Sequence, residues 1–193
     1  MSTADARPGD VLVMAGAAGI EGSAILARDH GLQIARALGH GARREAERLA
    51  IEPGTSVVRA ARIAGASGAH ALHDPTEGGI GAAIHEMAYA AGLRVTVHLE
   101  RILVLEITRK ICDLLGIDPL GLTSSGALLV AIGPAHAARL VNALRKAHIS
   151  ASPIGGFEAG RGVRAKSGSK VTRVPWFERD EILRVRDSQP DGL

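Results

Sequence analysis

The stretch AHALHDPTEGGIGAAIHEMAYAAGLRVTVHLE, residues 69–100, carries the clearest structural pattern in the chain. Its first five residues form a short apolar segment that predicts a buried strand. From Ile80 the apolar residues recur at helical spacing, and Gly92 ends the predicted helix. Residues 93–100 then alternate between apolar and polar side chains, which is typical of a half-buried strand. The order strand, helix, strand favours a layered domain in which helices pack on a sheet.

Similar patterns occur on both sides of this stretch. Short apolar runs between turn residues predict strands, and apolar stripes at helical spacing predict helices. The further strands are expected at residues 11–15, 127–132, 149–154 and 171–174, and the further helices from 23, at 43–49, 57–64, 106–115 and 134–147. We therefore predict an α/β (α+β) domain, a two-layer mixed sheet with helices mainly on one face. This domain is expected to span residues 8–182, with a polar tail at 183–193.

Composition limits the function classes. The chain has 193 residues, of which 46% are hydrophobic, so it can bury a sizeable core and wholesale disorder is excluded. No apolar run is long enough to span a membrane, and the first ten residues lack a secretory signal. The single cysteine, Cys112, cannot form an internal disulfide. We expect a cytoplasmic protein without a membrane partner.

The charge balance gives little support for nucleic-acid binding. Lys and Arg number 23, of which 19 are Arg, against 20 Asp and Glu. The cations are mostly neighboured by acids, as in RREAER at residues 43–48. Binding of single strands also uses aromatic stacking platforms, and the chain has only four aromatic residues. We therefore expect no nucleic-acid partner.

The turn DPTEGG, residues 74–79, is the most informative candidate site. Asp74 and Glu77 offer hard oxygen ligands of the kind that hold Mg²⁺ beside a phosphate. Backbone N–H groups at the start of a helix favour an anion, and the two glycines allow a ligand to approach closely. The sequence therefore predicts metal ligands at Asp74 and Glu77 and phosphate contacts at the following residues: Thr76, Gly78 and Gly79. The alternative interpretation is local, with Asp or Thr capping the helix.

A second glycine pattern, Gly16-x-x-Gly19-x-x-Gly22, follows the first predicted strand. A strand, a glycine loop and a helix in this order are typical of nucleotide phosphate loops. The spacing matches neither G-x-G-x-x-G nor the P-loop, so neither dinucleotide nor P-loop binding follows. Tight packing of strand on helix is the alternative explanation of the glycines. Glu21 within the loop is less easily explained by packing.

Two further residue types give little support for a metal or catalytic site. His70 and His73 are three positions apart in a predicted strand, so they point to opposite faces, which disfavours shared metal ligation. Cys112 lies among apolar neighbours on a predicted helix, which favours a core thiol over a nucleophile.

Residues 70–79, the helix after them and the segment LLGIDPL at 114–120 together resemble the C-terminal domain of the AIR (aminoimidazole ribonucleotide) synthetase superfamily. The likeness covers roughly residues 8–181 and is closest to hydrogenase maturation factor-like and uncharacterised AIR synthase-related proteins. It implies use of ATP and Mg²⁺, which the family binds on an N-terminal domain that also builds its dimer. That domain is expected to be absent from this chain, so tight binding of either cofactor is not expected here.

The resemblance implies the substrate and phosphate side of an ATP-dependent phosphoryl-transfer or dehydrating enzyme, inactive without its ATP domain. A phosphorylated small molecule or nucleotide would be its ligand. Across the cleft from the turn at 74–79, the opposite wall would be formed by Gly19, Glu21 and Gly22. A homodimer is also expected, because loss of the N-terminal partner would expose an apolar patch. The alternative is a non-catalytic binding or regulatory module that has lost the ATP domain.

Overall fold

A computed structural model describes residues 2–167 and 170–187 of the chain. The strands are β1 (Val11–Ala15), β2 (Ala69–His73), β3 (Arg94–His98), β4 (Leu128–Ile132), β5 (Ala151–Glu158), β6 (Gly162–Ser167) and β7 (Lys170–Thr172). The helices are α1 (Ile20–Asp29), α2 (Gly31–Leu38), α3 (His40–Arg48), α4 (Val58–Ala66), α5 (Gly79–Ala91), α6 (Glu106–Leu115), α7 (Pro134–Lys146) and α8 (Glu181–Asp187). Short helical turns occur at η1 (Thr3–Asp5), η2 (Ala50–Gly54), η3 (Leu99–Arg101) and η4 (Pro119–Gly121).

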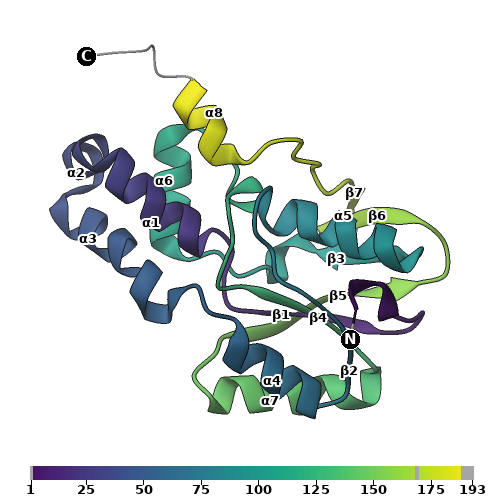
Figure 1. Ribbon diagram of the computed structural model, residues 1–193. Helices are drawn as coiled ribbons and strands as arrows, with labels where there is room; N and C mark the ends of the chain where they lie inside the picture. Colours follow the sequence, from purple (N-terminus) through teal and green to yellow (C-terminus); the bar gives the residue numbers. More distant parts are fainter. Residues whose placement is uncertain (1, 168–169, 188–193) are drawn as a thin grey trace.

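The strands form one seven-stranded mixed sheet in the order β2-β4-β1-β5-β3-β6-β7 (Figure 1). Every neighbouring pair is antiparallel except β3 and β6, which run parallel. The predicted fold class, a mixed α/β sheet domain, is therefore confirmed.

Helices cover both faces of the sheet, a more even distribution than the sequence indicates. Leu12 and Met14 of β1 belong to the apolar cluster that includes α5, whereas Val13 and Ala15 belong to the cluster of α4 and α7. Successive side chains of a strand point to opposite faces. Because β1 and β4 are apolar at consecutive positions, each face needs a cover, and α5 lies on one side while α4 and α7 lie on the other (Figure 1).

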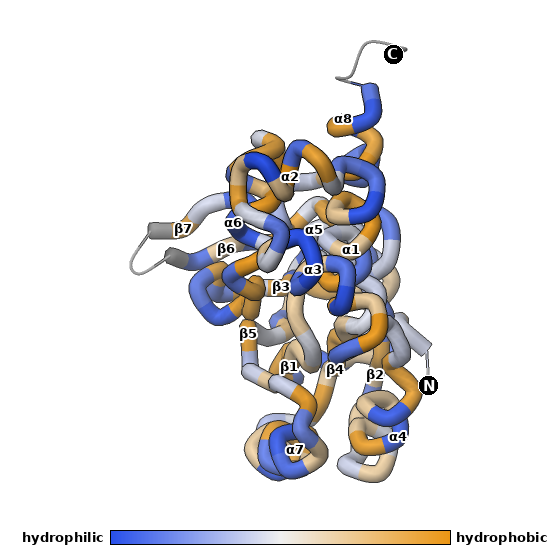
Figure 2. Tube along the Cα trace, turned by 90° about the vertical axis from the view of Figure 1, so that its left-hand side faces the viewer, coloured by the Kyte–Doolittle hydropathy of each residue, from blue (hydrophilic) through white to orange (hydrophobic). Residues whose placement is uncertain are grey.

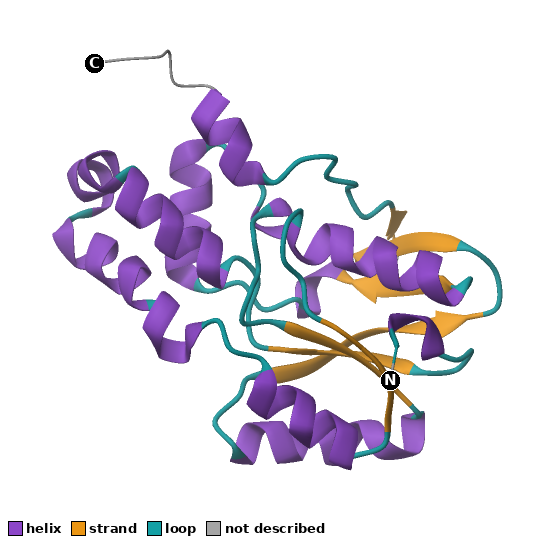
Figure 3. Ribbon diagram, viewed as in Figure 1, coloured by secondary structure: helices purple, strands orange, loops and turns teal. Residues whose placement is uncertain are grey.

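A helical lobe stands beside the sheet and contains α1, α2, α3, α6 and α8 (Figure 3). It has its own apolar cluster, which includes Ile34 of α2, Ile111 of α6 and Val185 of α8. In contrast to this apolar cluster, most of α3 is hydrophilic (Figure 2). Within the described residues, no helix combines the length and apolar character needed to cross a membrane.

Among the α-helices and strands, α2, α8 and β6 were not predicted from the sequence. Residues 183–187, which the sequence assigns to a polar tail, belong to α8 because Ile182 and Val185 pack into the lobe. The remainder of that tail, residues 188–193, lies outside the described residues.

Candidate functional site

The turn at residues 74–79 connects β2 to α5, as predicted. Both of its glycines have left-handed backbone conformations, with φ of 72° at Gly78 and 62° at Gly79. A side chain at Gly79 would place its Cβ 2.5 Å from the carbonyl oxygen of Leu120 and 2.6 Å from that of Leu122. The glycines therefore let the start of α5 lie directly against residues 120–122, which is a packing requirement and not in itself a ligand site.

The start of α5 is already occupied by an anionic group of the same chain, the carboxylate of Asp180. The backbone N–H of Gly78 donates to Oδ2 of Asp180 at 2.9 Å, and the hydroxyl of Thr123 donates to the same oxygen at 2.6 Å. The other carboxylate oxygen accepts from the N–H of Ile182 at 2.9 Å. Asp180 is only 7% exposed. A phosphate could use the N–H of Gly78 only if this carboxylate moved away.

The side chains of the turn itself face solvent. Asp74, Thr76 and Glu77 are all exposed. The Asp74 side chain makes no hydrogen bond or ion pair with any other described residue, so it does not cap α5. The backbone of Thr76 is used locally, because its carbonyl oxygen accepts from the N–H groups of Gly79 at 3.1 Å and Ser124 at 3.3 Å.

The residues of the turn therefore suit Mg²⁺ better than they suit a phosphate. Two exposed carboxylates are the donor type that Mg²⁺ takes, with water or phosphate completing its shell. Within the described residues no group of three or more His, Cys, Asp or Glu side chains could hold a metal ion. The carboxylates fit the metal, whereas the occupied N–H of Gly78 does not fit a phosphate in the arrangement seen here.

A cavity of about 470 Å³ opens beside the turn. Glu77, Gly78, Thr123 and Asp180 line it together with residues of the segment that precedes α8. The ring of Phe177 in that segment packs on Gly81 and Gly121, where a Cβ atom would overlap it. The segment before α8 thus forms part of the wall of the candidate site, although it lies about a hundred residues from the turn in sequence.

The glycines of the second loop serve packing in this structure. Gly19 has φ of 70°, and its N–H donates to Oγ of Ser124 at 2.9 Å. A side chain at Gly22 would overlap the side chain of Leu122, and the N–H of Gly22 donates to the carbonyl oxygen of Thr123 at 3.0 Å. These contacts bring α1 close to residues 122–124.

The two loops therefore contact the same segment, residues 120–124, from different sides. The structure does not place their glutamates in one cavity. Glu77 lines the cavity described above, whereas Glu21 lines another of about 440 Å³ together with Arg28, Glu47 and Thr55. The assignment of Gly19, Glu21 and Gly22 to the opposite wall of one cleft stays a prediction.

The histidines of β2 have separate partners. Nδ1 of His70 lies 2.9 Å from the carboxylate oxygens of the buried Asp10, and Nε2 of His73 lies 2.7 Å from Oε2 of Glu86 on α5. Burial raises the pKa of the Cys112 thiol to about 12, with nearby carboxylates adding to the shift. A thiol with this pKa is protonated near neutral pH and is a poor nucleophile.

Asp180 and Thr123 hold the start of α5, and sequence reasoning missed the part that Asp180 plays. A local signal was present, because an Asp just before a helix can cap it by accepting from a backbone N–H two residues later, as Asp180 does from Ile182. That signal indicates the start of α8. It gives no indication that the same carboxylate reaches Gly78.

The seven-stranded mixed sheet, the glycine turn and the order of elements define a layered α/β domain. The chain belongs to the family described as AIR synthase related protein, C-terminal domain, which it matches over residues 7–167. The resemblance stated from the sequence is thereby confirmed.

Among curated relatives, carbamoyl dehydratase HypE of Azotobacter vinelandii is 31% identical over 145 residues, which cover 75% of this chain and 40% of that protein. The crystal structure of HypE from E. coli matches with a TM-score of 0.73 at 22% identity, covering 95% of this chain and 55% of that one. A HypE structure in complex with ATP matches with a TM-score of 0.69 at 26% identity, covering 94% of this chain and 55% of that one. The chain spans about 40% of the length of curated HypE relatives.

Proposed function

We propose that this domain forms the substrate and phosphate side of an ATP-dependent enzyme that carries out phosphoryl transfer or dehydration in the cytoplasm. The observation that carries the proposal is the turn at 74–79 of a domain of this family: its two carboxylates are exposed, and one of them, Glu77, lines a cavity. The HypE relatives support it, since they are named carbamoyl dehydratases and one has been solved with ATP.

In this proposal Asp74 and Glu77 hold Mg²⁺ at the mouth of the cavity. When bound, the ion would neutralise charge on transferring phosphate oxygens, and enzymes of this class depend mostly on such neutralisation and on positioning. Thr76 lies between the two carboxylates in sequence, and its exposed hydroxyl can contact a ligand there. The cavity side of the turn is closed by Asp180, which keeps the N–H of Gly78 from the ligand.

Paramagnetic broadening by Mn²⁺ tests the metal site. Mn²⁺ replaces Mg²⁺ on carboxylate ligands, and we expect it to broaden the backbone NMR signals of residues 74–79 first, more strongly when ATP is present. Asp74→Asn with Glu77→Gln should remove this broadening, whereas the matched control Asp113→Asn, at another exposed carboxylate, should leave it unchanged. If the broadening were unchanged in the double variant, Asp74 and Glu77 would not be the metal ligands.

Measurement of ATP hydrolysis separates the proposal from its alternative. We expect no turnover from this chain alone, because the family binds ATP on another domain. The catalytic proposal requires turnover once an ATP-binding domain of a family member is added, and loss of that turnover in Asp74→Asn. If Mn²⁺ and ATP leave the turn unaffected and no such mixture turns over, the chain is better described as a binding or regulatory module.

A further inference from the structure

A groove of about 650 Å³ lies between α5 and the start of β6. Its lining comes from three parts of the chain: residues within 85–92 on the outer side of α5, residues 161–163, and Trp176 in the segment that connects β7 to α8. That segment runs along α5 (Figure 1). The groove is therefore formed by tertiary packing, since its walls are distant from one another in sequence.

Two of the four aromatic residues of the chain line this groove with more than half of their surface uncovered. Tyr89 is 90% exposed and Trp176 is 57% exposed. The ring of Trp176 stands edge-on to that of His85, with 5.3 Å between the ring centroids, and Nε2 of His85 lies 3.2 Å from the carbonyl oxygen of Val174. The fold therefore orients Trp176 while leaving much of its surface free for contact.

The charged groups of the lining are used unequally. Oε2 of Glu86 lies 2.7 Å from Nε2 of His73, so this carboxylate already has a partner. Arg161 is exposed, and its side chain makes no hydrogen bond or ion pair with any described residue. The free charge in the groove is therefore a single guanidinium group beside two uncovered aromatic rings.

The surroundings of Arg161 are basic as well. Residues 159–177 contain five Lys and Arg and no Asp or Glu. Of these cations Arg164, Lys166 and Arg173 are also exposed and have no ion pair with any described residue, whereas arginines of α1 and α3 have acidic partners. Uncompensated charge of one sign on one side of a protein attracts and orients partners of the opposite sign.

We propose that this groove is a docking site for an acidic segment of a partner protein, which places an apolar side chain against Tyr89 and Trp176 and a carboxylate on Arg161. Trp, Tyr and Arg are the residue types that most often carry the binding energy of protein interfaces, and all three line this one groove. The excess of basic residues around it selects an acidic partner. No residue of the turn at 74–79 takes part except through its neighbours, so the proposal does not depend on the catalytic function.

Selection of peptides on the whole chain from a phage-displayed random library tests this site. We expect the selected peptides to share an excess of Asp and Glu around a Phe or Leu. Because Trp176 is the only tryptophan of the chain, its fluorescence reports on occupation of the groove. A synthetic peptide of the shared sequence should shift this emission to shorter wavelength and protect it from quenching by acrylamide.

A matched pair of double variants locates the binding. Tyr89→Ala with Arg161→Gln should weaken the affinity for the synthetic peptide at least about tenfold, because two of the main contacts are lost. Leu32→Ala with Arg36→Gln removes the same kinds of exposed side chain from α2 and should leave the affinity unchanged. All four side chains are exposed, so both variants should melt at the temperature of the wild type, which excludes misfolding as the cause of a loss.

Several results would overturn the proposal. These are the absence of any enriched acidic peptide, an unchanged Trp176 emission in the presence of the synthetic peptide, or an equal loss of affinity in the α2 control. Dimerisation of the chain in sedimentation that is lost in Tyr89→Ala with Arg161→Gln would assign the groove to a second copy instead. Tighter binding of oligothymidylate than of the peptide, seen in the same emission, would assign it to a nucleic acid.

Discussion

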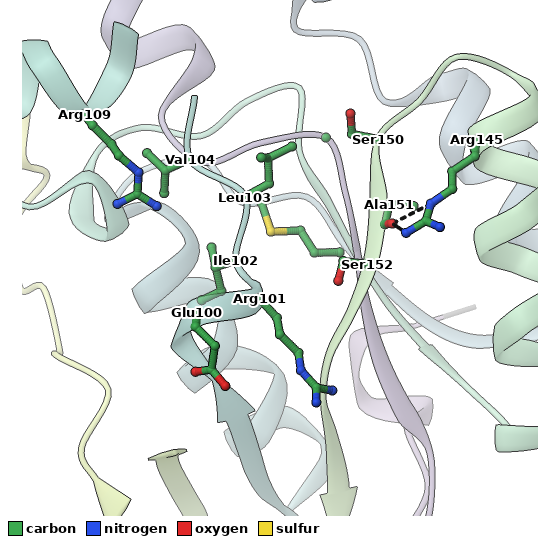
Figure 4. Close-up of a pocket in the computed structure, with 12 residues that line it drawn as sticks. Glu100, Arg101, Ile102, Leu103, Val104, Arg109, Arg145, Ser150, Ala151 and Ser152 are labelled. Carbon is green, nitrogen blue, oxygen red and sulfur yellow. Dashed lines mark hydrogen bonds between the residues drawn. The ribbon is translucent and has the colours of Figure 1, made fainter. Parts of the chain in front are cut away.

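The turn before α5 differs from a cavity of about 640 Å³ beside β5, which Arg101, Arg109 and Arg145 line (Figure 4), in how its polar groups are used. At the turn, the sequence predicts a free anion site, yet the N–H of Gly78 donates to the buried carboxylate of Asp180. In the cavity, no glycine motif indicates a ligand, yet two of its guanidinium groups have no partner among the described residues. The donors at the turn are satisfied by the fold, and those in the cavity are available.

This difference shows that a helix start favours an anion without determining which anion occupies it. A buried carboxylate from the same chain competes with a ligand at no cost in translational entropy, so it occupies the position first. Counting the hydrogen bonds of each donor therefore distinguishes a structural anion position from a binding site. The following experiments test that distinction.

The largest expected effect is at Asp180. Asp180→Ala should lower the free energy of unfolding by about 4 kcal/mol, because it leaves the N–H groups of Gly78 and Ile182 and the hydroxyl of Thr123 without their acceptor. Urea denaturation measures the change. Asp187→Ala is the matched control, since its ion pair with Arg179 is largely exposed and should contribute less than about 1 kcal/mol.

The same variant can also convert the turn into an anion site. With the carboxylate removed, inorganic phosphate should raise the melting temperature of Asp180→Ala more than that of the wild type, because the N–H of Gly78 is then free. An equal effect of phosphate on both proteins would show that the start of α5 does not accept an external anion, whatever the role of Asp180 in stability.

The two ends of α5 provide the next comparison. Gly79 and Gly92 have nearly the same φ, 62° and 65°, but only Gly79 has backbone atoms where its Cβ would lie. Gly92→Ala should cost about 1 kcal/mol for the left-handed conformation alone. Gly79→Ala should cost about 3 kcal/mol, because a contact with the carbonyl oxygens of Leu120 and Leu122 is added.

Thermal or urea unfolding of the two variants gives this difference directly. Equal losses would mean that residues 120–122 shift away without cost. In that case the turn is less tightly packed than the structure indicates, and its glycines are available for a ligand.

A smaller effect, with opposite signs, is expected for two glycines inside helices. Gly41 in α3 has open space around it, so Gly41→Ala should stabilise the protein by up to about 1 kcal/mol. Gly22 in α1 lies against Leu122, so Gly22→Ala should destabilise it by about 2 kcal/mol. A stabilising Gly22→Ala would contradict the packing role of this loop and favour a role in ligand binding.

The sequence predicted the parts of the fold that depend on local patterns. Helix α5 and strands β1, β2 and β4 have regular apolar spacing within one segment, and all were found at the expected places. β6 was missed because its position is set by parallel pairing with β3, about seventy residues away. α2 was missed because it follows α1 after His30, without a residue that caps it through its side chain.

The candidate site divides in the same way. The exposed turn at 74–79 follows from glycines and carboxylates adjacent in sequence. Its partner Asp180 is 102 residues from Gly78, and the arginines of the cavity come from three separate elements. A single sequence does not indicate which distant residues will meet, because neither residue of such a pair changes the local pattern around the other. Contacts of this kind became visible only once the chain was folded.

The smallest expected effect is on the pKa of Glu106, and it is tested with two adjacent cations of α6, Arg109 and Lys110. Nζ of Lys110 lies 2.6 Å from Oε1 of Glu106, and this hydrogen bond and charge lower the pKa of the Glu106 carboxyl. The stabilisation by this pair is therefore present above the ordinary carboxyl pKa and is lost as the pH falls through the lowered one. Lys110→Met should return the pKa of Glu106 toward its ordinary value, as followed by NMR titration.

Arg109, the neighbour of Lys110, serves as the control in that titration. Because its guanidinium has no partner among the described residues, Arg109→Gln should leave the pKa of Glu106 nearly unchanged. If Arg109→Gln instead raised the pKa of Glu106 as much as Lys110→Met does, the charge of Arg109 would also interact with Glu106, contrary to the structure.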